Sequence, residues 1–157
     1  SGVPEMMAQT YYSTNMTPQI QNGFNGGIWA KLEEAVRMEI PQGDTLYVVT
    51  GAVFEKHGVD EEVKEIVNRN DSKTLPVPNY YWKALLKVRR ENGEVTEAST
   101  IGFWLPHDDL KGRSYPDYAV SVDQIEVWTG FDFFSNLVDA IETTAEANAT
   151  WTSFRNF

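Results

Sequence analysis

Apolar residues return every three or four positions between Ile28 and Met38, in the string IWAKLEEAVRM. This period predicts an amphipathic helix over Ile28–Met38, because residues three and four apart share one helix face. Glu33 and Arg37 stand four residues apart in that helix, in the order that favours an ion pair along its surface. Asn22-Gly23, just upstream, is a turn signal, because both residues tolerate positive φ.

Other segments carry the β-branched and aromatic residues that are typical of strands. The expected strands are residues 45–54, 80–89 and 97–104, with short ones at 11–16 and 118–120. Asn92-Gly93 separates the second from the third and predicts a hairpin. Residues 59–69 are interpreted as a short charged helix and residues 72–78 as a proline-containing loop.

Two further helices are expected towards the C-terminus. Ser121 is a candidate N-cap for a helix over 122–129, with Gln124 completing a capping box and Gly130 ending the helix. A last helical segment is expected over 135–145. Hairpin-linked strands with helices at intervals predict an α+β fold, an antiparallel β-sheet with flanking helices.

Composition limits the classes of protein that the chain can represent. Its 157 residues fit a single domain over 1–157, with residues 1–10 interpreted as a mobile leader. No apolar run is long enough for a membrane-spanning helix, and the absence of cysteine excludes disulfide and thiolate metal sites. Twenty-three acidic against thirteen basic residues, a net charge of -10, argue against a simple basic clamp for nucleic acid.

The densest polar chemistry lies in residues 15–37. Asn15, Gln19 and Asn25 are amides beside turns and at the entrance of the expected helix, which carries Glu33 and Arg37. An amide oxygen with a carboxylate makes a hard-oxygen site of the kind that Mg²⁺ prefers, and a nearby arginine suits a phosphate. The structural alternative is that Asn25 caps the helix and that Glu33 and Arg37 form a solvated surface pair.

The strings TNMTPQ, FNGGIW and LEEAVR closely resemble the DNA/RNA non-specific endonucleases of the ββα-metal (His-Me finger) superfamily. The resemblance continues in order through VVTGAVFE, LPVPNYYWKALL and VSVDQIEVWTGFDFF, and covers roughly residues 10–137. It implies the ββα-metal fold and hydrolysis of phosphodiester bonds in DNA or RNA with Mg²⁺ or Mn²⁺ as cofactor. It also implies an extracellular or periplasmic location.

The resemblance assigns roles to individual residues of this chain. Asn25 matches the asparagine that ligates the single metal ion, and Glu33 the glutamate that orients a metal-bound water. Asn15 matches a second active-site asparagine. Arg37 matches an arginine that touches the phosphate, and Gln19 is expected beside it as a second substrate-binding residue.

The family's general base is a histidine in an Asp-Arg-Gly-His motif, and this string does not occur among the 157 residues. His57 and His107 lie outside that context and are expected to be surface residues. We therefore expect a C-terminal part of an endonuclease domain, with a fold incomplete at its N-terminus and inactive alone. Two alternatives stay open. One is a non-catalytic binding module on a degenerate nuclease scaffold, and the other a homodimer in which a second copy supplies the base.

Overall fold

The computed structural model describes residues 17–39, 45–135 and 150–157. Its centre is a four-stranded antiparallel sheet in the order β1-β4-β5-β6. The strands of this sheet are β1 (Thr45–Val53), β4 (Tyr80–Glu91), β5 (Glu94–Pro106) and β6 (Ala119–Val120). A separate two-stranded sheet pairs β2 (Glu65–Val67) with β3 (Thr74–Pro76). The helical segments are η2 (Gln21–Trp29), α2 (Ala30–Met38), η3 (Tyr115–Tyr118), α3 (Val122–Thr129) and α5 (Trp151–Arg155).

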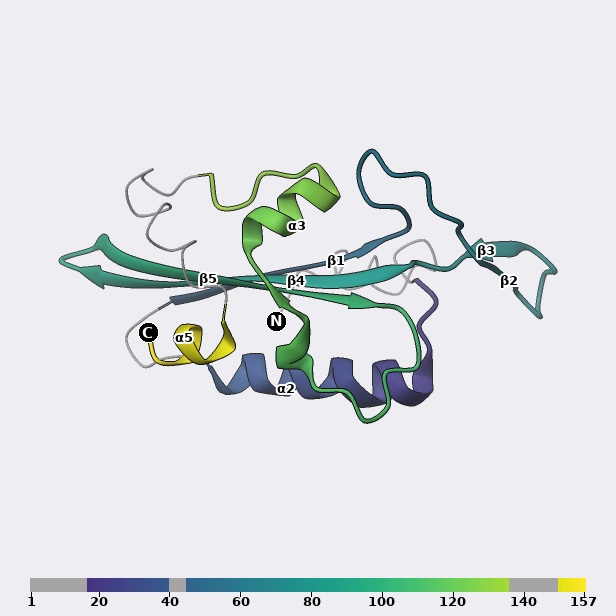
Figure 1. The fold of residues 1–157 in the computed structure, drawn as a ribbon, viewed down its shortest axis with the longest axis horizontal. Coiled ribbons are helices and arrows are strands. Elements are labelled where there is room, and N and C mark those ends of the chain that lie inside the picture. The colour runs from purple at the N-terminus through teal and green to yellow at the C-terminus, as the bar shows by residue number, and fades with distance from the viewer. Residues whose placement is uncertain (1–16, 40–44, 136–149) are drawn as a thin grey trace, which may run out of the picture.

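Helices cover both faces of the central sheet (Figure 1): α2 and α5 lie on one face and α3 on the other. Alternation along β4 sends Tyr81 and Leu85 into the core under α2, while Trp82 and Ala84 pack towards α3. The sequence prediction of an α+β fold with an antiparallel sheet and flanking helices is therefore confirmed.

The long β4–β5 hairpin forms as the sequence predicts. Asn92 and Gly93 both adopt positive φ, 53° and 81°, which suits the twist of a two-residue hairpin turn. Trp82 pairs with Trp104 across the two strands. Side chains of β4 and β5 pack against the helices on both faces of the sheet.

Helix α3 also begins and ends where the sequence predicts. The Ser121 side chain accepts a hydrogen bond from the Gln124 backbone N–H at 3.1 Å. Gly130 ends the helix in the left-handed region, with φ of 73°. Local capping chemistry is sufficient to predict this helix.

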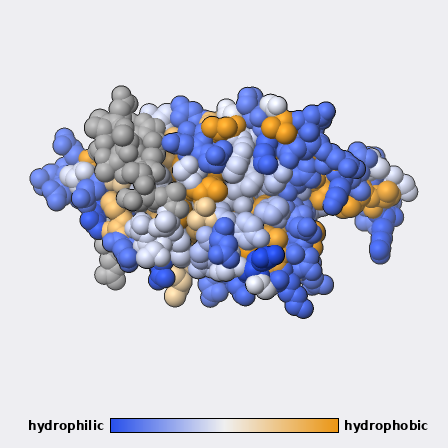
Figure 2. Space-filling model, viewed as in Figure 1, coloured by the Kyte–Doolittle hydropathy of each residue, from blue (hydrophilic) through white to orange (hydrophobic). Residues whose placement is uncertain are grey.

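The helix expected over residues 59–69 is wrong, and the loop expected over 72–78 is only partly right. Residues 65–67 and 74–76 instead form the β2–β3 hairpin, whose turn is fixed by a hydrogen bond from the Asn70 N–H to Asn68 Oδ1. A short helix needs an apolar face to bury, and Val59, Ile66 and Val67 remain exposed. Figure 2 shows apolar side chains on the projecting tip of the molecule that this hairpin forms.

The strand expected over 11–16, the leader over 1–10 and nearly all of the helix expected over 135–145 lie outside the described residues. Among the described helices, none has the length and apolar character that crossing a membrane requires.

Candidate functional site

The predicted helix over Ile28–Met38 is confirmed, and a kink at Gly27, with φ of -124° and ψ of -110°, separates it from the wide, irregular turns of η2 upstream. Gly23 takes a φ of 80° in the predicted turn, whereas Asn22 stays extended. The backbone N–H of Asn25 donates to the Ile20 carbonyl at 2.9 Å, a five-residue step that is typical of a π-helix. Such wide turns are frequent at functional sites.

Asn25 does not cap the helix. It lies inside η2, upstream of the kink at Gly27, and neither Ile20 before η2 nor Trp29 before α2 makes a side-chain cap. Asn25 Nδ2 donates to Gln21 Oε1 at 3.3 Å, which directs the amide and leaves Oδ1 without a hydrogen-bond partner among the described residues. The half-buried Asn25 therefore presents an amide oxygen that is available to a ligand.

Glu33 lies beside a buried lysine of the central sheet. Lys83 Nζ is 3.8 Å from Glu33 Oε1, donates to Thr50 Oγ1 at 2.9 Å and lies 4.6 Å above the Trp29 ring. Only 5% of Lys83 is exposed. Burial lowers the pKa of Lys83, while the Glu33 carboxylate opposes that shift. The pair therefore fixes a carboxylate of α2 against β4.

The ion pair expected between Glu33 and Arg37 does not form, because Glu33 pairs with Lys83 instead. A buried ammonium needs a counter-charge more than an exposed guanidinium does. Arg37 is exposed, and its charge further lowers the pKa of Lys83, so the guanidinium lies in the same electrostatic neighbourhood. Arg37 has no carboxylate partner among the described residues.

Gln19 is turned towards the start of β4. Its side chain hydrogen-bonds the Tyr81 hydroxyl, which also contacts Thr17 Oγ1 at 2.6 Å and donates to the Pro18 carbonyl at 3.1 Å. Burial raises the pKa of Tyr81, so its hydroxyl stays protonated. These contacts anchor the segment that enters η2. Asn15 lies outside the described residues.

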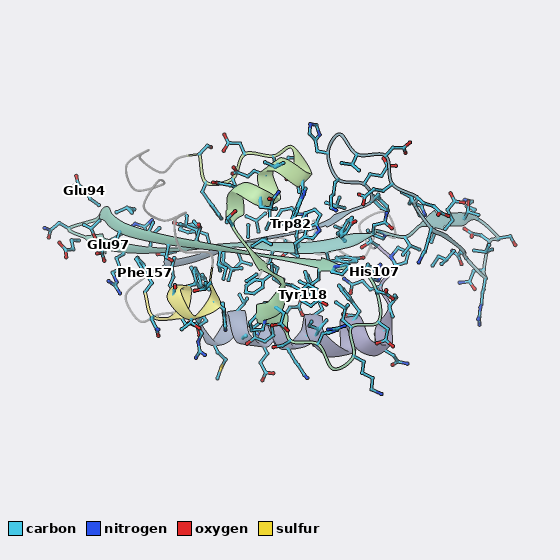
Figure 3. The ribbon with its side chains drawn as sticks, in the orientation of Figure 1. Trp82, Glu94, Glu97, His107, Tyr118 and Phe157 are labelled. Atoms are coloured by element: carbon cyan, nitrogen blue, oxygen red, sulfur yellow. The ribbon has the colours of Figure 1, made fainter. Side chains whose placement is uncertain are left out.

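His107 is not the surface residue that we expected. It is half-buried at the end of β5 (Figure 3), against the rings of Phe24 and Tyr81. Its Nε2 accepts from the Ile20 N–H at 2.8 Å and its Nδ1 donates to the Pro78 carbonyl at 2.8 Å. Both ring nitrogens are thus engaged, and burial lowers the pKa of His107. This histidine is structural.

His57 is exposed, as expected, and belongs to the opposite side of the sheet. Its backbone N–H donates to the Trp128 carbonyl of α3 at 2.6 Å, and its ring lies against Gly130. Because α2 covers the other face (Figure 1), His57 does not lie beside Glu33.

Sequence reasoning missed Lys83 as a member of this cluster. A signal was present in YYWKALLKVRR, where Lys83 and Lys87 fall in the same alternating phase as Tyr81 and Leu85. A lysine in the buried phase of a strand implies a buried charge with a partner. Lys87 follows the same rule, since its Nζ lies 3.4 Å from Glu39 Oε2.

The residues present fit a hard divalent cation by their donor chemistry. Asn25 offers an amide oxygen that has no hydrogen-bond partner within residues 17–39, 45–135 and 150–157, and Glu33 offers a carboxylate that is 42% exposed. Mg²⁺ is often held by one or two protein oxygens, with water completing its shell. The described part of the chain contains no group of three or more His, Cys, Asp or Glu that could hold a metal.

The fold of this chain is similar to that of a solved structure. A chain in a crystal structure of the EndoG/EndoGI complex matches it with a TM-score of 0.59 and 21% identity, covering 85% of this chain and 54% of that chain. A sequence model of the DNA/RNA non-specific endonucleases matches residues 1–140. The chain therefore belongs to the DNA/RNA non-specific endonuclease family, and the resemblance stated from its motifs is confirmed.

Relatives from bacteria and fungi are named as nucleases. A nuclease of Nostoc sp. is 30% identical over 89% of this chain, and one of Serratia marcescens is 27% identical over 94%. Nuclease 1, mitochondrial, of Schizosaccharomyces pombe is 26% identical over 85%. The matches cover 48%, 51% and 42% of these relatives, so the chain spans about half of their length.

The expected extracellular or periplasmic location, which is based on the family resemblance, is wrong. The relative from S. pombe and those from Saccharomyces cerevisiae, Xenopus laevis and Mus musculus are named as mitochondrial nucleases. Family membership therefore does not imply secretion.

Proposed function

We propose that this chain supplies the metal- and phosphate-binding part of a site that hydrolyses phosphodiester bonds in DNA or RNA. The observation that carries the proposal is the cluster of Glu33 and Arg37 of α2 with Lys83 of β4, beside the η2 segment that presents Asn25. A fixed carboxylate, with an exposed guanidinium and an amide oxygen that have no partner in the described part of the chain, suits a metal-assisted attack on phosphate. Family membership and the names of the relatives support the same assignment.

Each residue has a separate task in this proposal. Asn25 Oδ1 would hold Mg²⁺ or Mn²⁺, and Glu33 would accept a hydrogen bond from a water of that ion. When bound, the ion would stabilise negative charge on the phosphate. Arg37 would hold a phosphate oxygen, with Asn15 and Gln19 as further contacts from the segment before the helix. Because these groups contact the phosphate and not the base, selectivity for sugar and sequence would be low.

Lys83 of β4 contacts Glu33 from the sheet side of α2. Its ammonium pairs with the Glu33 carboxylate and restricts its rotamers, so that Glu33 is oriented before any ligand arrives. Preorganised charge is more effective than charge that must reorient during the reaction. Lys83 is thus a positioning residue in the proposed site.

The proposed general base is neither of the two histidines in the chain. Both ring nitrogens of His107 are hydrogen-bonded, and His57 lies on the α3 side of the sheet. The base therefore has to come from another source. We propose that free imidazole can replace it, because a positioned general base typically contributes about 10²–10⁴-fold to such a rate.

The test is plasmid nicking by this chain with Mg²⁺ or Mn²⁺, with and without imidazole. We expect nicking that rises with imidazole concentration and is lost in Glu33→Ala. Robust nicking without imidazole, together with a dimer by light scattering, would instead favour a base supplied by a second copy. Binding of DNA without nicking under any condition would favour the non-catalytic binding module.

Metal binding is tested separately by titrating the chain with Mn²⁺ and following the EPR signal of the free ion. We expect Asn25→Ala to weaken binding markedly, because it removes the proposed protein ligand. Asn70→Ala, in the exposed β2–β3 turn, is the matched control and is expected to bind as the wild type does. Equal affinity in Asn25→Ala and wild type would rule out the metal assignment.

A further inference from the structure

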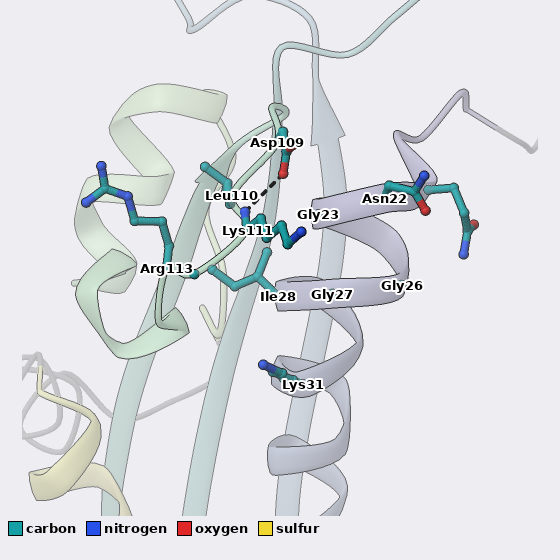
Figure 4. A pocket seen from close by; sticks show the side chains of 12 residues that line it. Asn22, Gly23, Gly26, Gly27, Ile28, Lys31, Asp109, Leu110, Lys111 and Arg113 are labelled. Atoms are coloured by element: carbon teal, nitrogen blue, oxygen red, sulfur yellow. Dashed lines mark hydrogen bonds between the residues drawn. The ribbon is translucent and has the colours of Figure 1, made fainter.

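A second group of cations lines an open hollow on the flank of the same helix. The hollow has a volume of about 540 Å³ and lies between the η2–α2 segment and the loop that follows β5. Its lining contains three cationic residues, Lys31 of α2 and Lys111 and Arg113 of the loop, of which Arg113 points away from the helix (Figure 4), and the single carboxylate of Asp109. In a chain with a net charge of -10, this local excess of positive charge requires an explanation.

These three cations are not neutralised by neighbouring carboxylates. Within residues 17–39, 45–135 and 150–157, none of them makes an ion pair, whereas Lys83 and Lys87 each pair with a glutamate. Asp109 offsets only one of the three charges, and its Oδ1 accepts the backbone N–H of Lys111 at 3.0 Å instead of forming an ion pair with any of them. Like charges gathered in one hollow repel each other, and an anion would remove that repulsion.

The walls of the hollow also allow a ligand to approach the backbone. Figure 4 shows Lys31 and Lys111 extending into the space between helix and loop, while Arg113 points away from the helix. Gly27 and Gly112 line the same space, and a Cβ added to either would meet no atom within 4 Å. Open glycine backbone between ammonium groups suits a compact anion such as a phosphate.

The hollow adjoins the candidate metal site through Gln21. This residue lines the hollow, and its Oε1 accepts the hydrogen bond from Asn25 Nδ2. We propose that the hollow is a second phosphate subsite, in which Lys31 and Lys111 bind a backbone phosphate of the nucleic acid strand away from the bond that is cleaved. The inference rests on the proposed function, since it assumes that the strand passes the Asn25 end of the helix.

The test measures binding in the absence of cleavage. A fluorescein-labelled single-stranded oligonucleotide is titrated with the chain in EDTA, and anisotropy is followed across a salt series. The Lys31→Ala/Lys111→Ala variant is compared with wild type. Its control is Arg69→Ala/Lys73→Ala, which removes the same charge from the β2–β3 hairpin. All four side chains are exposed, so we expect both variants to fold, as checked by circular dichroism.

We expect the Lys31→Ala/Lys111→Ala variant to bind on the order of tenfold more weakly, with a salt slope reduced by about 1.4, or about 0.7 for each lost contact to a single strand. The control is expected to match the wild type in both. An unchanged slope and affinity in the lysine variant would overturn the subsite. A wild type that binds hexaglutamate as tightly as the oligonucleotide, or that does not bind the oligonucleotide, would also overturn it.

The outcomes separate this inference from the proposed function. Lysine-dependent binding without imidazole-dependent nicking would keep the subsite and reject hydrolysis. Nicking that depends on Glu33, combined with binding that is indifferent to Lys31 and Lys111, would keep hydrolysis and reject the subsite.

Discussion

Lys83 Nζ lies 3.8 Å from Glu33 Oε1, so that an ion pair joins the central strand β4 to the helix α2. The two ends of the pair differ in environment, because the Lys83 side chain is 7% exposed and that of Glu33 is 42% exposed. The buried end is locked by Thr50 Oγ1 and the Trp29 ring. The outer end is thereby held in one orientation where solvent and ligands can reach it.

Replacing Lys83 by methionine should lower the nicking rate without lowering the thermal stability of the fold. A buried charge with a lowered pKa is replaced by an apolar side chain of similar length, so we expect a melting temperature equal to that of the wild type or higher. Imidazole-dependent nicking should fall about tenfold or more, because Glu33 loses the contact that orients it. Thermal unfolding and nicking rates measure the two effects.

Lys83→Arg is the control for this change, since it keeps the charge and should retain much of the activity. A Lys83→Met variant that nicks DNA at the wild-type rate would show that Glu33 needs no anchor.

Burial lowers the pKa of His107 below its ordinary 6.5, so the ring should stay neutral in the folded protein, with Nε2 accepting the Ile20 N–H. The stability that this neutral ring supplies is fully present above pH 6.5 and is lost as the pH falls from there towards the lowered pKa of the folded state. NMR titration of the ring measures that pKa directly. An unshifted value of 6.5 or above would contradict the hydrogen-bonding scheme.

Substituting His107 should therefore loosen the entry to η2. We expect His107→Ala to destabilise the fold by about 1–3 kcal/mol above pH 6.5, because a backbone donor and a backbone acceptor lose their partner. Amide exchange at Ile20 should accelerate more than exchange in β4. The exposed His57→Ala, in contrast, should leave both measurements unchanged.

Glu61 gives the fold a second pH-dependent contact, on the other side of the sheet. Its carboxylate accepts hydrogen bonds from the Lys56 N–H at 2.8 Å and from the Tyr80 hydroxyl at 2.5 Å, and these lower the pKa of Glu61 below its ordinary 4.5. A lowered carboxyl pKa supplies stability that is present above pH 4.5 and lost as the pH falls through the folded-state value. We expect Glu61→Gln to lower the melting temperature at pH 7.

The difference in melting temperature between Glu61→Gln and wild type should shrink as the pH falls below 4.5, because Glu61 then takes up a proton and becomes neutral, as glutamine is at every pH. Glu62→Gln, exposed and next in the chain, is the matched control. A difference that is constant across this range would show that the charge of Glu61 has no role.

Gly51 is needed for the packing of Trp82. A Cβ at position 51 would lie 2.5 Å from Trp82 Cζ2, and the ring cannot move aside because Phe133 packs against it. We expect Gly51→Ala to destabilise the fold by about 1–3 kcal/mol through overpacking, measured by chemical denaturation. Val48→Ala, on the same strand and exposed, should change stability by less than about 0.5 kcal/mol.

Local signals are sufficient where neighbouring residues decide the backbone. Asn92-Gly93 can adopt the two positive φ values of a tight hairpin turn, and Ser121 and Gly130 bound α3 with their own chemistry. The Ile28–Met38 helix follows in the same way from the period of its apolar residues. The motif strings assign Asn25, Glu33 and Arg37 to this one helix or its entrance, and the fold agrees.

Local signals fail where a distant partner decides. Residues 59–69 have a helical period, yet no part of the described core covers them, and residues 65–67 pair with β3 instead. His107 has the sequence context of a loop residue, but its partners are 87 and 29 positions away in the sequence. Glu33 is spaced as a partner of Arg37, whereas its actual partner is the buried ammonium of a strand about fifty residues away.

The order of residues along the chain thus defines the family, the fold class, the hairpin and the helix that carries the candidate site. Each of these rests on contacts within a few residues or on a string of motifs that a linear sequence preserves. The tertiary structure decides which charged side chains are buried together. Packing of α2 against β4 removes Lys83 from water, and this burial lowers its pKa and places it beside Glu33. The same packing gathers Lys31, Lys111 and Arg113 around one hollow, where none of them has an ion-pair partner among the described residues. These residues meet because the packing places the loop after β5 beside α2, although the loop and the helix are far apart in the sequence.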